Sequence, residues 1–284
     1  MKMLKRIGIT LCVFIIFALA AFGINEVINN RVRLTEYTFI HPEVPDGFDG
    51  YRIMHISDLH EAPFAEQIIK HIDARKPDIV VITGDMVQLP DSSIYETLKI
   101  GRAVDVPIYA VTGNHDTQCG AYDEIMEALD ETDIIPLDND SVCLEKGGDT
   151  ILLLGIKDPS ENEVSQNKVE KIRKIIEKQF PDGPCFSILL SHRADLYPEI
   201  KDTSADLILS GHLHGGIIRL PFAGGLIGKD HEHPFFPEYE YGLIQEDGAA
   251  SMIVSGGCDK NPKKKRYFNP PEVVLITLRG EESQ

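Results

Sequence analysis

Cysteine and basic side chains are both scarce in this sequence, and each shortage argues against a class of protein. The chain has 5 cysteines and no C-x-x-C pair, which excludes a thiolate zinc ribbon. Cys12 lies in an N-terminal apolar stretch, and the other four cysteines allow three disulfide pairings between which the sequence does not choose. We interpret most of these cysteines as small buried hydrophobic residues.

Lys and Arg together number 28, against 45 Asp and Glu, and the formal net charge is -17. Contacts with a phosphate backbone need clustered Lys and Arg, so duplex DNA or another polyanion is not expected as the main partner. A small phosphate compound remains compatible with this charge, because bound metal ions can reverse the local field.

Long linkers, internal repeats and low-complexity tracts are also absent. A chain of 284 residues, of which 43% are hydrophobic, can bury a full core. We therefore predict one domain over residues 31–284, preceded by an N-terminal segment over residues 1–30.

The N-terminal segment has a basic start followed by a long stretch without charge. The run M-K-M-L-K-R precedes residues 7–25; as a helix, these would span about 28 Å, close to the thickness of a bilayer core. A signal peptide cleaved at the A-L-A site of residues 18–20 is the alternative, and a buried soluble helix is disfavoured because no polar face exists. We favour a retained single-pass anchor in the cell membrane, and the positive-inside rule then places the domain outside the cytoplasm.

After residue 50, short apolar runs alternate with amphipathic stretches. The runs predicted as strands are residues 51–56, 78–83, 108–112, 150–155, 186–190, 206–209, 217–219, 250–254 and 273–278. Helices are predicted around residues 68–72, 92–103, 121–130 and 163–178. This alternation predicts a layered α/β fold whose sheets are covered by helices.

Five of the predicted strands lead directly into polar motifs. The motifs are S-D-L-H (57–60), G-D (84–85), G-N-H-D (113–116), S-H-R (191–193) and S-G-H-L-H-G-G (210–216). Each motif alone has an ordinary explanation, such as a helix cap, a turn or an isolated core histidine. Because sites in open α/β sheets lie beyond the carboxyl ends of strands, five such motifs in order predict one shared site.

The donor atoms in these motifs suit divalent cations. Side chains at i and i+2 of an extended segment point the same way, so Asp58 and His60 can face one ion, and His212 and His214 one site. Carboxylate, imidazole and amide-oxygen ligands together suit Mn, Fe, Zn or Co better than a thiolate-rich structural zinc site. The donors are too many for one tetrahedral ion, and they suit two ions about 3.5–4 Å apart that share a bridging carboxylate.

The order D-x-H, G-D, G-N-H-D, S-H, G-H-x-H resembles the calcineurin-like metallophosphoesterase superfamily over about residues 50–280. The stretches at residues 47–60, 215–221 and 268–278 are similar to a membrane-anchored bacterial branch that includes UDP-2,3-diacylglucosamine pyrophosphatase-like enzymes. The resemblance implies an α/β-β/α sandwich of two mixed sheets flanked by helices, after an N-terminal transmembrane helix.

The resemblance also implies a role for each motif residue. One ion would be held by Asp58, His60 and His214, the other by Asn114, His192 and His212, and Asp85 would bridge both. A water-derived nucleophile activated between the ions would attack phosphorus in line. His115 would contact the phosphate and donate a proton to the leaving oxygen, with Asp116 orienting its ring. No ligand of this set is missing, which argues against a non-catalytic copy of the fold.

Two positions depart from the branch. Ile217 stands where the branch often has Gln after H-G-G, and Ser255-Gly256-Gly257 stands where it often has S-R-G. Both positions lie near where substrate is expected, so the branch's substrate does not carry over to this chain.

Three further features have an ordinary interpretation that we favour, and a fourth has two open interpretations. Asp230-His231-Glu232-His233 is interpreted as a loop rather than a further metal site, because no strand precedes it. Lys263-Lys264-Lys265-Arg266 is interpreted as a solvated turn rather than a contact for anionic lipid or substrate phosphate. Packing is favoured over an apolar lip for a lipid chain at Phe235, Phe236, Tyr239 and Tyr241. Arg193 either touches a substrate phosphate or pairs with Asp195.

These predictions describe a membrane-anchored, two-metal phosphoesterase that acts on a small or lipid-linked phosphate substrate. The bond is a phosphodiester or pyrophosphate, in a lipid-linked or nucleotide-linked sugar. A nucleotide sugar would usually be cytoplasmic, which conflicts with an outside-facing domain, whereas a lipid-linked phosphate removes the conflict. A phosphomonoesterase, a nuclease or a non-catalytic metal-binding membrane scaffold are the alternatives, and no stable nucleic acid partner is expected.

Overall fold

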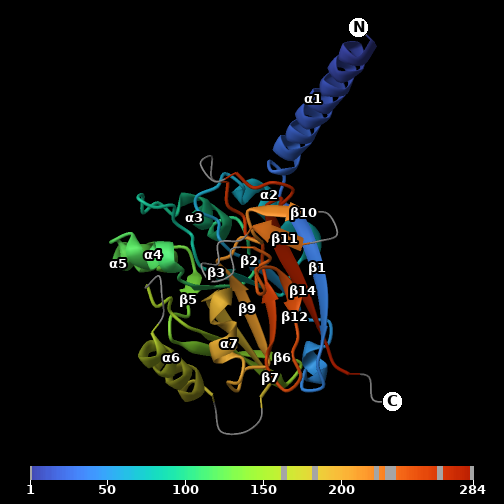
Figure 1. The fold of residues 1–284 in the computed structure, drawn as a ribbon. Coiled ribbons are helices and arrows are strands. Elements are labelled where there is room, and N and C mark those ends of the chain that lie inside the picture. Colours follow the sequence, from blue (N-terminus) through green and yellow to red (C-terminus); the bar gives the residue numbers. More distant parts are fainter. Residues whose placement is uncertain are drawn as a thin grey trace.

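The computed structural model describes residues 2–160, 165–180, 185–220, 224–227, 235–260 and 265–281. A long N-terminal helix, α1 (Lys2–Ile28), projects from one end of a layered α/β domain (Figure 1). The remaining described elements form two sheets with helices outside them. This arrangement confirms the predicted sandwich of two mixed sheets flanked by helices.

Each sheet has 6 strands and mixes parallel with antiparallel pairs. The first sheet has the order β1 (Arg33–Ile40), β14 (Glu272–Arg279), β2 (Arg52–Ile56), β3 (Ile79–Thr83), β4 (Ile108–Val111) and β5 (Ile134–Pro136). The second has the order β12 (Gly242–Ile244), β13 (Ser251–Val254), β9 (Leu207–Gly211), β8 (Ser187–Arg193), β7 (Asp149–Gly155) and β6 (Ser141–Lys146). A separate hairpin pairs β10 (Ile218–Leu220) with β11 (Gly224–Ile227).

Helices cover the outer face of each sheet. The first sheet packs against α2 (Ala65–Arg75), α3 (Tyr95–Gly101) and α5 (Tyr122–Asp130). The second packs against α6 (Gln166–Lys178) and α7 (Tyr197–Ile200). The domain also has the short helix α4 (Asn114–Gln118) and two single-turn 3-10 helices, η1 (Asp46–Phe48) and η2 (Ala194–Leu196).

The buried strands read as continuous apolar runs because both faces of each sheet are covered. Strand β3 has the sequence I-V-V-I-T with every residue buried. Ile79 and Val81 enter the core between the two sheets, whereas Val80 and Ile82 enter the core under the helices. The period of two along a strand thus feeds two separate cores.

Every strand predicted from the sequence is present, with ends that differ by a few residues. The structure adds elements that the sequence patterns did not indicate: β1, β5, β6, β11, β12, α4 and α7. Strand β1 lies at a sheet edge and exposes much of its R-L-T-E-Y-T-F-I sequence, so it lacks an apolar run. Strands β5 and β12 have 3 residues each, too few to give a pattern.

Helix α1 is long and apolar enough over Lys5–Ile28 to cross a membrane, with a mean hydropathy of 2.7, and its residues before Asn25 are almost all exposed. A signal sequence has the same properties. The last turns of α1 nevertheless contact the domain: Asn25 Nδ2 and Asn29 Nδ2 donate to the Arg266 carbonyl over 3.0 and 2.7 Å. The predicted boundary at residue 30 between the N-terminal segment and the domain stays a prediction. These hydrogen bonds connect the segment before the boundary with the domain after it.

His55 is expected to stay neutral well below the usual pKa of a histidine. It is buried between the sheets on the same face of β2 as Ile53, with Nε2 2.7 Å from Thr83 Oγ1. Burial lowers the pKa of His55 to about 4. The unfolded chain takes up this proton near pH 6.5, so the contribution of His55 to stability falls as the pH drops from about 6.5 toward 4. An NMR titration of the ring nitrogens measures this, and a midpoint near 6.5 in the folded protein would contradict it.

Candidate metal centre

The predicted donors gather where the ends of β2, β3, β4, β8 and β9 meet. Asp58 and His60 follow β2, Asp85 follows β3, and Asn114 opens α4 after β4. His212 and His214 follow β9. His192 was expected just beyond the end of a strand. It lies inside β8, which continues to Arg193 and has an irregular register between Leu190 and Arg193.

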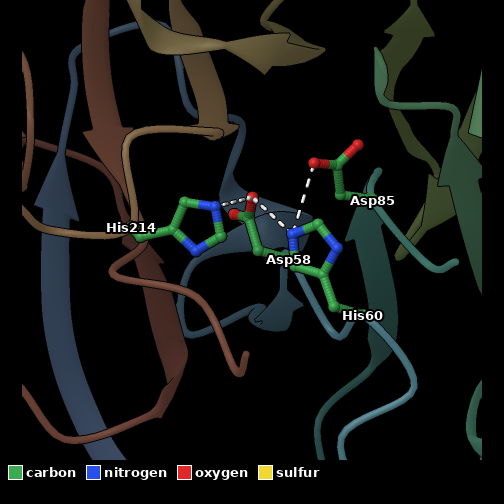
Figure 2. Close-up of side chains that lie close together, drawn as sticks. All are labelled: Asp58, His60, Asp85 and His214. Atoms are coloured by element: carbon green, nitrogen blue, oxygen red, sulfur yellow. Dashed lines mark ion pairs between the residues drawn. The ribbon is translucent and has the colours of Figure 1, made fainter. Parts of the chain in front are cut away.

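Asp58, His60, Asp85 and His214 form one group of buried donors (Figure 2). His60 Nε2 lies 3.3 Å from Asp85 Oδ2 and 4.0 Å from Asp58 Oδ1. His214 Nε2 lies 3.5 Å from the same Asp58 oxygen. The ring nitrogens and carboxylate oxygens converge, as the ligands of one cation must.

Asp85, His192 and His212 form a second group, which shares Asp85 with the first. His192 Nε2 lies 3.4 Å from Asp85 Oδ1, 3.2 Å from Asn114 Oδ1 and 3.1 Å from His212 Nδ1. Asp85 therefore turns one oxygen toward each group. A carboxylate in this position fits a bridge between two cations.

Main-chain and side-chain partners orient three of the histidines. His60 Nδ1 lies 2.9 Å from the Val87 carbonyl, and His192 Nδ1 lies 2.7 Å from the Thr83 carbonyl. A carbonyl accepts a proton from the ring, so each contact places the N–H on Nδ1 and leaves the Nε2 lone pair toward the donor group. His214 Nδ1 forms an ion-pair contact with Asp259 Oδ1 over 2.8 Å.

Asp259 was not singled out from the sequence. It lies five positions beyond Val254, the end of β13, and an acidic residue after a strand is the signal that identified the other donors. Arg266 Nη1 contacts the same Asp259 oxygen over 2.9 Å, and Arg266 Nη2 donates to the His214 carbonyl over 2.8 Å. Asn269 Nδ2 donates to that carbonyl over 2.7 Å. Asp259, Arg266 and Asn269 therefore hold the His214 ring and its main-chain carbonyl in place.

The interpretation of residues 263–266 as a solvated turn is wrong for Arg266, which is buried. Lys265 pairs with Glu26 of α1 over 2.8 Å, and residues 263 and 264 lie outside the described part of the chain. Residues 230–233, weighed above as a loop, lie outside it as well.

The backbone of the donor loops is left-handed at five of the predicted ligands. The φ angles are 50° at Asp58, 46° at His60, 53° at Asp85, 73° at His212 and 54° at His214. Non-glycine residues rarely adopt this conformation, and it concentrates at functional sites. The extended-segment reasoning was therefore wrong in its geometry, because Asp58 and His60 meet through turns. His212 and His214 join different donor groups, as the family resemblance implied.

The electrostatics of the site favour an added positive charge. Burial alone would raise the pKa of the Asp85 carboxyl, but His192 and His60 hold it well below its usual range. Burial alone would lower the pKa of His192, but Asp85 raises it to about 10. A divalent cation supplies the same compensation to the carboxylates and takes the place of the histidine proton. The residues present thus fit a pair of cations.

His115 and Asp116 lie beside the bridging carboxylate. The His115 main-chain N–H donates to Asp85 Oδ1 over 2.8 Å, and its ring centroid lies 4.5 Å from that of His60. The Leu89 N–H makes a long contact of 3.5 Å with His115 Nδ1, which favours the tautomer with the proton on Nε2.

Both carboxylate oxygens of Asp116 accept main-chain N–H groups, from Val87 over 3.0 Å and from Gly113 over 2.8 Å. Asp116 is therefore a brace between the loops after β3 and β4. Its predicted part in orienting the His115 ring stays a prediction.

Arg193 is buried beneath the site. Its Nε donates to Asp158 Oδ2 over 2.8 Å, and Nη2 donates to Oδ1 over 3.3 Å. This two-point contact with Asp158 was not anticipated from the sequence. Asp195, the partner that the sequence suggested, also interacts with Arg193, whose charge offsets part of the rise that burial causes in the pKa of Asp195. A substrate phosphate is not expected to reach a guanidinium enclosed in this way.

The chain belongs to the calcineurin-like phosphoesterases, because the profile of that family matches residues 51–216, more than half of its length. This confirms the resemblance seen in the motifs. Together with the donor cluster, the family makes the chain a metal-dependent phosphoester hydrolase.

Proteins similar to this chain include two relatives of similar length and one solved structure. The chain is 28% identical over 272 residues to the metallophosphoesterase YkuE of Bacillus subtilis strain 168, covering 88% of this chain and 87% of YkuE. It is 24% identical over 301 residues to UDP-2,3-diacylglucosamine pyrophosphatase LpxG of Chlamydia muridarum, covering 89% and 91% of the two chains. A crystal structure of the protein TT1561 of Thermus thermophilus superposes with a TM-score of 0.49 at 12% identity, covering 73% and 89%.

Replacing Asp259 with asparagine is expected to weaken metal binding by about 10–100-fold, the usual cost of losing a carboxylate behind a ligating histidine. The change removes the negative charge 2.8 Å from His214 Nδ1 and leaves the donor atoms in place. Calorimetric titration of the metal-free protein with Mn²⁺ measures the dissociation constant. Asp49→Asn is the control, because Asp49 pairs with Arg279 at the surface. Equal affinities in the two variants would contradict a role for Asp259 in holding His214.

Proposed function

We propose that this protein hydrolyses a phosphodiester or pyrophosphate bond with two divalent cations, in a substrate that carries a lipid-linked or nucleotide-linked sugar. The observation that carries the proposal is the placement of Asp85, which turns Oδ2 toward His60 and Oδ1 toward His192. One carboxylate shared between two donor groups suits a pair of ions better than two independent sites.

The cations, when bound, supply Lewis-acid stabilisation of the phosphoryl oxygens and lower the pKa of bound water. Asp58, His60 and His214 would hold one of them, Asn114, His192 and His212 would hold the other, and Asp85 would belong to both sets. Mn, Fe, Zn and Co are the metals that this mixture of nitrogen and oxygen ligands suits. The chain contributes fixed ring orientations, through Val87, Thr83 and Asp259, so that the donors need no rearrangement on binding.

His115 is proposed as the proton donor to the leaving oxygen. Its ring is half-buried at the edge of the donor cluster, against His60. The Leu89 contact favours a proton on Nε2. A histidine that carries its proton on the ring nitrogen away from the main chain can deliver it to a leaving alkoxide.

The lipid-linked alternative is the one we favour. A retained α1 places the catalytic domain at the membrane, outside the cytoplasm by the positive-inside rule, where nucleotide sugars are not supplied. The name of the Chlamydia muridarum relative describes a nucleotide-linked diacylated sugar, which combines both chemistries. The basic start before residue 7 and the charge-free stretch after it support the anchor.

A His115→Gln variant separates proton donation from metal binding. For a diester whose leaving group is a basic alkoxide, we expect kcat to fall by about 100- to 10,000-fold, because general acid catalysis contributes that much. For a p-nitrophenyl ester the fall is much smaller, since that leaving group needs little protonation. Steady-state kinetics on the two substrates measure the difference, with metal content as the control. An equal loss on both would contradict the assignment of His115 as the acid.

The proposed function is tested with the full chain, purified in detergent and loaded with Mn²⁺. Bis-p-nitrophenyl phosphate, a polyprenyl or diacyl-lipid pyrophosphate, a UDP-sugar and p-nitrophenyl phosphate are compared by kcat/KM. We expect turnover of the diester and the highest kcat/KM on the lipid pyrophosphate. Preference for the monoester would make the protein a phosphomonoesterase, and no turnover of any substrate in the metal-loaded protein would favour a non-catalytic scaffold.

A further inference from the structure

Four aromatic side chains lie exposed at the end of the domain from which α1 leaves. The exposed fractions are 66% for Phe235, 62% for Phe236, 38% for Tyr267 and 42% for Phe268. Tyr239 packs in the core of the second sheet as expected, whereas the packing interpretation is wrong for Phe235 and Phe236. Exposed phenylalanines of this kind indicate a contact surface when they gather on one face.

Phe268 is held directly to the foot of α1. Its main-chain N–H donates to Asn25 Oδ1 over 2.8 Å, and Asn25 Nδ2 donates to the Arg266 carbonyl over 3.0 Å. Asn25 is buried against this segment. The segment and the end of the helix therefore move as one body, and the height of Phe268 along α1 is fixed.

That height coincides with the expected boundary of the bilayer. The charge-free stretch ends at Asn25, and the next residue, Glu26, pairs with Lys265 over 2.8 Å. Phe22 lies one helical turn nearer the membrane centre, and its ring is 5.1 Å from Lys265 Nζ. Tryptophan, tyrosine and lysine side chains gather at this depth in membrane proteins, and phenylalanine lies on apolar faces that enter it.

The other three aromatics border the small sheet of β10 and β11: Tyr267 and Phe235 pair with its strands, and the Phe236 main-chain N–H donates to the Leu226 carbonyl of β11 over 3.3 Å. Ile218 of β10 pairs with Tyr267 on one side and with Ile227 of β11 on the other. Ile227 in turn pairs with Phe235, so Phe235 and Tyr267 are about 15 Å apart, three strand spacings. Figure 1 shows β10 and β11 at the α1 end of the domain. This sheet begins four residues after His214, so the surface and the donor cluster are parts of one loop system.

We propose that Phe235, Phe236, Tyr267 and Phe268 form a membrane-contact surface that enters the lipid headgroup region of the bilayer spanned by α1. The surface and the docked end of α1 hold the donor cluster beside the bilayer in one orientation. The site then takes its phosphate from molecules of that same membrane. This inference rests on the proposed membrane anchor, and it deepens the proposed lipid-linked substrate.

The absence of tryptophan from the chain makes a direct test possible. Single-tryptophan variants Phe236→Trp and Phe268→Trp report on the surface, Phe14→Trp reports on the middle of α1, and Ile40→Trp is the matched control. Ile40 is an exposed apolar residue at the far end of β1, at 59% exposure. Each full-length variant is reconstituted into phosphatidylcholine and phosphatidylglycerol vesicles that contain lipids brominated either near the headgroup end or near the terminus of the acyl chain.

We expect loss of fluorescence at positions 236 and 268 with the shallow bromines, loss at position 14 with the deep bromines, and no loss at position 40. If positions 236 and 268 are not quenched, like position 40, while position 14 is quenched, the proposed contact surface is wrong and the membrane anchor is retained. Blue-shifted emission at 236 and 268 without quenching would mean that protein, such as a second copy, covers the surface, which also overturns it. No quenching at position 14 would remove the anchor and the surface with it. None of these readings depends on hydrolysis, so they are independent of the catalytic proposal.

Discussion

Asp85→Asn is expected to lower kcat/KM on a phosphodiester by about 1,000-fold or more, because one change disturbs both cations and the charge stabilisation they supply. The asparagine keeps one oxygen and presents an NH₂ group in place of the other. In the parent protein, Asp85 Oδ2 lies 3.3 Å from His60 Nε2 and Oδ1 lies 3.4 Å from His192 Nε2. The asparagine can keep an oxygen at only one of these two places, so one of the two histidines faces an NH₂ group instead. Steady-state kinetics with bis-p-nitrophenyl phosphate and the Mn²⁺ content of the purified protein measure the effect.

Asp206→Asn is the matched control for this change. Asp206 is a half-buried carboxylate that accepts the Ser187 main-chain N–H over 2.7 Å, and its replacement is also isosteric. It lies at the start of β8 and β9, the ends of the strands opposite to the donors. We expect Asp206→Asn to keep its metal and its activity. Full activity in Asp85→Asn would eliminate the two-metal proposal, whatever the behaviour of the control.

Gly113→Ala is expected to lower the free energy of unfolding by about 1–3 kcal/mol, the usual cost of overpacking a closely packed site. A Cβ on Gly113 would lie 2.3 Å from Asp85 Oδ1 and 2.4 Å from the Asp85 main-chain nitrogen. The φ angle of Gly113 is -100°, which any residue adopts, so the effect is steric and not conformational. Because the nearest groups are a ligand oxygen and backbone, the loops after β3 and β4 must separate. A shift of about 1 Å in Asp85 can lower activity about 100-fold.

Gly280→Ala provides the comparison for Gly113→Ala. The nearest atom to a Cβ on Gly280 is the Val44 carbonyl oxygen at 3.4 Å, an ordinary contact. Chemical denaturation and kcat/KM of the two variants are compared with the parent protein. We expect Gly280→Ala to match the parent in both. If Gly113→Ala retained parental kcat/KM and stability, the close approach of the two loops would not be what sets the position of Asp85.

Much of the fold was predictable because the buried strands carry their signal locally. Runs such as D-I-V-V-I-T and L-I-L-S-G are buried on both faces, so their apolar character does not depend on which strands lie beside them. Edge strand β1 and the 3-residue strands β5 and β12 carry no such signal. Their existence depends on a neighbour that supplies the hydrogen bonds, and for β1 that neighbour is β14, at the other end of the chain.

The donor motifs were predictable for the same reason, since each stands next to its own strand. The structure brings these residues together, while their roles as ligands stay predictions until a metal titration is made. Asp259, Arg266 and Asn25 could not be assigned from the sequence. Their function lies in contacts with residues far along the chain: Asp259 with His214, Arg266 with the His214 carbonyl, and Asn25 with Phe268.

The sequence by itself determined the chemical kind of the site and the layered fold, because both follow from short local patterns of apolar runs and metal-binding side chains. The motif resemblance also implied that Asp85 bridges two ions and that His212 and His214 serve different ones. Only the tertiary structure decided how the donors are arranged, with Asp85 Oδ2 toward His60 and Oδ1 toward His192. It also decided that the end of α1 docks against the loop that holds His214. The physical reason is that these features are made by left-handed turns and long-range contacts, which residue spacing along the chain does not encode.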